Sequence, residues 1–264
     1  MRDILVITIS CLALLVALYG IWERRSVAHR QYVVRLSELI DEINQLNLDQ
    51  DHAAETELDD AGRNAAFNQR REMLCREAMR FIEWLEPQPE WFWRLVPRQW
   101  LHPTVTDTQH RSLGHALAQV GDGPNALRHL EQAIGVAPPL SLSRMFALRG
   151  HAAFLCRSGA PDRGKASYDA ALEIAQSLDG DDRHFAVGET HLYWARQLFH
   201  AGTQPWELLQ SVDDEFARIS HTGRRERAMH QLNRTRLELL AQAHRSLTET
   251  RKSTGSPSSH TSPR

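Results

Sequence analysis

Apolar residues recur every three or four positions through most of this chain, which is the spacing of one face of an α-helix. One such run extends from Leu36 to Leu46, a second covers residues 63–85, and a third covers residues 224–247. Runs in which valine, isoleucine and threonine alternate with polar residues are missing, so no β-strand is expected. The sequence therefore predicts an all-α protein.

The N-terminal segment of residues 4–22 contains no charged residue over nineteen positions. As a helix it would span about 28 Å, close to the hydrocarbon thickness of a bilayer. Tyr19 and Trp22 stand at its C-terminal edge, where amphipathic rings favour the headgroup level. A cleaved signal peptide usually has a shorter apolar core followed by small residues, whereas this segment ends in bulky ones. The prediction is one uncleaved transmembrane helix within residues 1–23.

Arginines flank this segment unevenly. Arg2 stands alone before it, whereas Arg24, Arg25 and Arg30 follow it. Because positive charge stays on the cytoplasmic side, the expected protein is single-pass in the cell membrane, with its N-terminus outside and its large C-terminal part in the cytoplasm. The reverse topology remains an alternative, in which the C-terminal part faces the periplasm as an accessory subunit of a secretion or envelope-assembly machine.

Two regions lie between the predicted anchor and the rest of the chain. Residues 24–62 read as a juxtamembrane helix and an acidic linker, which has six acids and no lysine or arginine between Asp49 and Asp60. Residues 63–103 read as a helix followed by a connection rich in tryptophan and proline. The favoured interpretation is that these tryptophans wedge between the N-terminal helices and the following helices. The alternatives are an interfacial belt on the membrane or a binding hot spot.

An internal repeat at an offset of 38 residues is the most specific feature. Small, large and glycine positions agree between the two copies at every aligned step, as expected for two helical hairpins with a glycine in each short turn. In the first copy these positions are Gly114, Leu117, Gly121, Ala126, Leu130, Ala133 and Ile134. In the second copy they are Ala152, Leu155, Gly159, Gly164, Tyr168, Ala171 and Leu172.

This spacing resembles the tetratricopeptide repeat, which pairs small and large residues on two helices and often closes with proline. The first unit reads LGHALAQVGDGPNALRHLEQAIGVAPP, with Pro138 in the closing place, and the second reads RGHAAFLCRSGAPDRGKASYDAALEIA. The second unit departs from the family at Gly164, where alanine is commoner, and a third, degenerate unit runs from about Arg183 to Ile219. The resemblance implies an α-solenoid over residues 104–222. A capping helix over 223–250 and a disordered tail over 251–264 would follow.

The layout also resembles the bacterial lipopolysaccharide assembly protein B family, in which an aromatic-glycine pair and paired arginines follow the membrane span. Tyr19-Gly20 and Arg24-Arg25-Ser26 stand in those places here. That family ends in a cysteine-rich metal module. This chain has no C-x-x-C motif, so a shared regulatory role does not follow.

Stacked helical hairpins leave a concave groove that is lined by side chains of the first helices. An arginine-rich lining would suit an acidic segment or a C-terminal carboxylate through bidentate hydrogen bonds. The alternative is that these side chains pair with acids on adjacent helices. The residues predicted to line the groove are Arg111, His115, Arg149, Arg157, Arg196 and His200.

Composition narrows the remaining functions. The formal net charge is −2, which gives no electrostatic case for nucleic acid. Nucleotide-binding and hydrolase motifs and H-E-x-x-H are missing, so no cofactor, metal site or catalytic residue is predicted. The sequence therefore predicts a membrane-anchored adaptor or scaffold that recruits a protein or peptide partner. An enzyme with an unrecognised helical active site is the further alternative.

Overall fold

A computed structural model describes residues 2–55, 61–85 and 105–254, and this part of the chain is helical with short turns and no strand. The prediction of an all-α protein is confirmed. The chain forms two compact units, residues 1–137 (unit 1) and residues 138–264 (unit 2). The tryptophan- and proline-rich connection after Leu85 and the predicted disordered tail lie largely outside the described residues.

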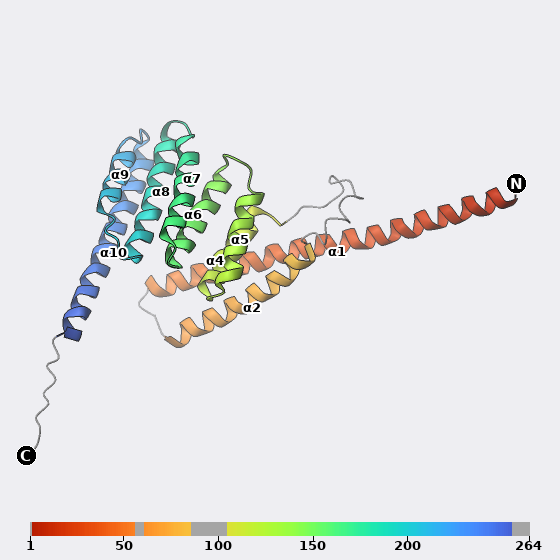
Figure 1. Ribbon diagram of the computed structural model, residues 1–264, viewed down its shortest axis with the longest axis horizontal. Coiled ribbons are helices and arrows are strands. Elements are labelled where there is room, and N and C mark those ends of the chain that lie inside the picture. The colour runs from red at the N-terminus through yellow and green to blue at the C-terminus, as the bar shows by residue number, and fades with distance from the viewer. Residues whose placement is uncertain (1, 56–60, 86–104, 255–264) are drawn as a thin grey trace, which may run out of the picture. The chain divides into compact units, whose positions relative to one another are not determined.

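Unit 1 is built on two long helices, α1 (Arg2–Glu55) and α2 (Ala61–Leu85). The two pack against each other, and Figure 1 shows α1 extending well beyond the end of α2 toward the N-terminus. The juxtamembrane helix predicted after residue 24 is thus continuous with the helix that contains residues 4–22. The contact buries the predicted apolar stripe from Leu36 to Leu46.

Within the part of the chain that the structure describes, no helix combines the length and apolar character needed to cross a membrane. Most side chains of residues 4–22 lie outside the described residues, so the membrane anchor stays a prediction.

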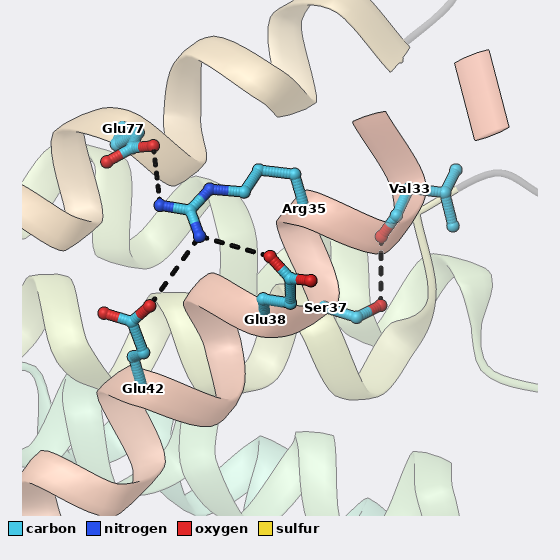
Figure 2. Close-up of polar contacts among 6 residues, drawn as sticks. All are labelled: Val33, Arg35, Ser37, Glu38, Glu42 and Glu77. Carbon is cyan, nitrogen blue, oxygen red and sulfur yellow. Dashed lines mark hydrogen bonds and ion pairs between the residues drawn. The ribbon is translucent and has the colours of Figure 1, made fainter. Parts of the chain in front are cut away.

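Arg35 on α1 contacts three carboxylates, one of which lies on α2, as Figure 2 shows. Its guanidinium lies 3.2 Å from Glu38 and 3.7 Å from Glu42 on its own helix, and 3.2 Å from Glu77 on α2. The side chains of Arg35 and Glu77 are about two-fifths exposed, so solvent screens the interaction. Its main effect is to set the register of two antiparallel helices.

A shorter hairpin, α4 (Asp107–Gln119) and α5 (Gly123–Val136), completes unit 1 and packs on both long helices through α4. Thr106 and Gln109 form a capping box that satisfies free N–H groups at the start of α4. The amide of Gln109 also donates to the Ser37 hydroxyl at 3.0 Å, so the cap of α4 is tied to α1.

Unit 2 contains two more hairpins and a final helix. Its core includes residues of α8, α9 and α10, among them Leu192, Phe216 and Leu232. The third hairpin, predicted as a degenerate unit from about Arg183 to Ile219, is therefore present. The helices are α6 (Leu142–Arg157), α7 (Pro161–Gln176), α8 (Gly180–His200), α9 (Trp206–Ala217) and α10 (Thr222–Thr254).

The three hairpins share one turn. Gly121, Gly159 and Gly202 follow the first helices with φ of 84°, 81° and 80°, a left-handed conformation that glycine adopts without strain. After each glycine, the next N–H reaches back to the carbonyl of a leucine in the last turn, at 3.0, 2.9 and 2.9 Å. This is the Schellman motif. The glycine turns predicted by the repeat are confirmed in all three hairpins.

The helices of the first two hairpins approach closely where the repeat predicts small residues. A Cβ atom added to Gly114 would lie 3.2 Å from the Ala126 carbonyl oxygen, and one added to Gly164 would lie 2.8 Å from the Ala152 carbonyl oxygen. The glycine is therefore on the first helix of one hairpin and on the second helix of the other. This explains why Gly164 departs from the alanine of the family pattern.

Burial also repeats between these two hairpins. In both copies, the third of the seven aligned positions is exposed, the seventh is partly exposed, and the other five are buried. Large residues fill the contact between helices, and the exposed position is the turn glycine. The two copies are thus equivalent in packing as well as in sequence.

Two histidines meet inside the α4–α5 hairpin. The Nδ1 atoms of His110 and His129 are 3.1 Å apart, and both rings are buried. The pKa of each is lowered to about 4, mainly by burial; Arg128 contributes to the lowering at both, His110 contributes at His129, and Asp107 opposes the effect at His110. The pair is therefore neutral at pH 7, with one ring donating to the other.

Gly164→Ala should destabilise the protein by about 1–3 kcal/mol, because the new methyl group meets backbone rather than a movable side chain. Gly135→Ala in α5 is the matched control, since a Cβ there meets nothing within 4 Å, and it should stabilise by about 0.5–1 kcal/mol. Urea unfolding followed by circular dichroism measures both. Equal effects of the two substitutions would contradict the close approach.

Acid should weaken the α4–α5 hairpin. Between pH 6.5 and about pH 4.5 the unfolded histidines bind protons that the folded pair excludes, so stability falls as pH falls. The loss is about 2–3 kcal/mol for one histidine over that range. Unfolding free energies at several pH values test this, and His110→Asn with His129→Asn should flatten the slope. The exposed His230→Asn serves as control and should leave the slope unchanged.

Candidate functional site

The six predicted groove residues fall into two sets. Arg111 and His115 lie on α4 in unit 1, where both are partly buried and have interaction partners. The other four lie on α6 and α8 in unit 2, and the structure gives them two different roles.

Arg149 joins α6 to α8. Its side chain is 7% exposed, its Nε donates to the Thr190 hydroxyl at 2.9 Å, and its Nη2 donates to the Ala186 carbonyl at 2.8 Å. Burial lowers the pKa of Arg149 to about 10, which leaves it charged at pH 7. A guanidinium enclosed in this way holds two helices together and does not line an open groove.

Arg196 makes a similar contact one hairpin further along the chain. Its Nη2 donates to the Thr235 hydroxyl of α10 at 2.7 Å and lies 3.4 Å from Glu238. Thr190 and Thr235 are fully buried, and each hydroxyl also donates to the carbonyl four residues earlier in its own helix. We call these the two Arg–Thr contacts; they connect α6 to α8 and α8 to α10.

Glu189 lies near both arginines. Burial raises the pKa of its carboxyl group, whereas Arg149, Gln231 and Arg196 act in the opposite direction. Its Oε1 atom is buried without a hydrogen bond. The opposite charges reduce the cost of burying this carboxylate, so Glu189 belongs to the same connection between first helices.

Arg157 and His200 remain exposed. Each is the residue that directly precedes the C-cap of its helix, two positions before the turn glycine, so the two occupy equivalent places on α6 and α8. A positive charge there also interacts favourably with the helix dipole. Of the four predicted residues of unit 2, these two are exposed, Arg196 is partly exposed and Arg149 is buried.

A groove of about 1040 Å³ follows one face of α2 in unit 1. Its apolar lining comes from Tyr32, Met73, Phe81 and Trp84. Three arginines (70, 76 and 80) and two glutamates also line it, so the groove is amphipathic. The apolar pattern did not indicate this groove, because most of its lining residues on α2 are polar or charged and only Phe81 belongs to the predicted apolar face.

Sequence reasoning also missed the threonines of the Arg–Thr contacts. A threonine inside an otherwise apolar helix face was the available signal, since a buried hydroxyl needs a partner beyond its own helix. In the described part of the chain, no group of three or more His, Cys, Asp or Glu side chains could hold a metal ion.

Comparison of the chain with protein-family models, with curated proteins and with solved structures finds no match.

Arg149→Ala should destabilise the protein by about 2–4 kcal/mol, because it removes a buried cation that two helices enclose and leaves a cavity. The matched control is Arg157→Ala on the same helix, which should change stability by less than about 0.5 kcal/mol. Thermal and urea unfolding of the full chain measure both. A neutral Arg149→Ala would show that the contact to α8 does not hold unit 2 together.

Proposed function

We propose that this protein is a membrane-anchored adaptor or scaffold, rather than an enzyme, and that its helical hairpins recruit a protein partner. The observation that carries the proposal is the repeated Arg–Thr contact. The buried Arg149 joins α6 to α8, and Arg196, whose side chain is 36% exposed, joins α8 to α10. Contacts that tie the first helix of each hairpin to the next non-adjacent helix are what a stack of tetratricopeptide-like hairpins requires, since each hairpin buries its apolar face against its neighbours.

The proposed anchor is residues 4–22. Its support is the absence of charge over nineteen positions and the unbroken course of α1 from Arg2 to Glu55. The excess of arginine after this segment favours a cytoplasmic location for both units. Anchoring raises the local concentration of whatever the hairpins bind, which is the contribution of an adaptor at a membrane.

The proposed partner surface is the C-terminal end of the first helices, where Arg157 and His200 are exposed at equivalent positions. Two cationic or polar groups at a repeated position suit an acidic segment or a C-terminal carboxylate. Arg149 and Arg196 contribute indirectly, because they hold these helices in place.

A charge reversal on the first helix tests the proposal. Full-length Arg157→Glu should capture its partner from solubilised membranes at least about fivefold less than the wild type, a loss of about 1 kcal/mol. Arg163→Glu is the matched control, an exposed arginine on the second helix of the same hairpin, and its capture should be unchanged. Quantitative mass spectrometry compares the captured proteins. Identical profiles for wild type and Arg157→Glu would overturn this partner surface.

A further inference from the structure

We propose that the end of the α1–α2 hairpin nearest the N-terminal segment binds the phospholipid headgroups of the membrane through Trp84, Arg80 and Arg30. The proposal rests on the proposed anchor in residues 4–22, and it adds a second membrane contact made by α2.

The register of the two helices places these residues at one end. Arg71 on α2 donates to Asn47 on α1 at 3.1 Å, and Arg35 on α1 lies 3.2 Å from Glu77 on α2. The ring of Tyr32 lies 6.0 Å from the ring of Trp84. In these three contacts, a lower residue number on α1 goes with a higher residue number on α2. The helix α2 therefore runs back toward the N-terminal segment and ends level with Tyr32.

The distance along α1 brings this end close to the expected membrane. Ten residues separate Trp22 from Tyr32, which is about 15 Å along a helix. An average helix tilt of about 20° toward α2, with the helix axes about 9 Å apart, reduces the height of the α2 end to about 11 Å. The headgroup layer occupies about 5–8 Å of that height. Tryptophan and arginine side chains are long enough to span the remainder.

The side chains at this end suit a headgroup layer. Trp84 is 74% exposed, and tryptophan is enriched at membrane interfaces, where its ring is partly in contact with apolar chains. Arg80 and Arg30 are exposed as well, and guanidinium groups bind phosphate in a bidentate manner. Arg24 adds a further exposed cation, against the exposed acids Glu23 and Glu83.

Charge and position favour lipid over a protein as the occupant. Arginines exceed acids at this end, which complements lipid phosphate. By contrast, Arg76, further along α2, lies in an ion pair with Glu72. The contact of Trp84 and Phe81 with Tyr32 also fixes the exposed indole to the helix that carries the proposed anchor.

Fluorescent labels on α2 test the contact in the full chain. Glu83→Cys and Glu72→Cys are matched positions, both exposed glutamates on one side of the helix, eleven residues or about 16 Å apart. Cys75 and Cys156 are buried, and Cys11 is replaced by alanine. The labelled protein is reconstituted into nanodiscs of phosphatidylcholine and phosphatidylserine that contain a headgroup-spin-labelled lipid. Quenching at position 83 should be at least about threefold greater than at position 72.

A double substitution separates binding from mere proximity. With the label at position 83, Trp84→Ser with Arg80→Glu should reduce quenching to within about 1.5-fold of position 72. Equal quenching at the two positions, or quenching that this double substitution leaves unchanged, would overturn the headgroup contact. Flotation with lipid after alkaline carbonate tests the anchor separately. Protein that carbonate removes would refute the anchor and this contact together, whereas retained protein without selective quenching refutes the contact alone.

Discussion

The distance at which two helices cross inside a hairpin is the constraint on which this structure depends. Backbone meets backbone at Gly164 and Ala152, where even one methyl group would have no room. A close crossing lets the large residues on either side interlock, and the Schellman turn then fixes where the second helix starts. Either helix can supply the glycine, as Gly114 shows in the other hairpin. The hairpin requires a residue without a side chain where the two helices cross, and this residue can lie on either helix.

Once the hairpins exist, unit 2 needs a connection between them, and the buried Arg149 and the partly exposed Arg196 contribute to it. A desolvated guanidinium is costly unless its donors are satisfied. Arg149 meets this condition with a threonine hydroxyl and a backbone carbonyl on α8, and Arg196 donates to a threonine on α10. The same side chain cannot both hold two helices and bind a partner. Arg149 and Arg196 hold helices of unit 2 together, so the proposed partner surface is built on the exposed Arg157 and His200 at the helix ends.

The continuity of α1 has a consequence for the proposed adaptor. A helix without a break transmits the position of residues 4–22 to everything that packs on it. The α4–α5 hairpin is tied to α1 at Ser37, which is about 22 Å along the helix from Trp22. Unit 1 would therefore hold its hairpin at a set height above a membrane. The end of α2 would lie lower still, within reach of lipid headgroups.

The sequence by itself determined the helices, the turn glycines and the two equivalent hairpins, because helical period and the left-handed turn are local properties of the chain. It also placed Arg157 and His200 correctly on first helices. Only the tertiary structure decided that Arg149 is buried, that Thr190 is its partner, and that two histidines face each other in the α4–α5 hairpin. A periodic pattern identifies the face of a helix on which a residue lies. It does not identify what covers that face, and the charge, burial and availability of a side chain depend on groups some 20 to 40 positions away.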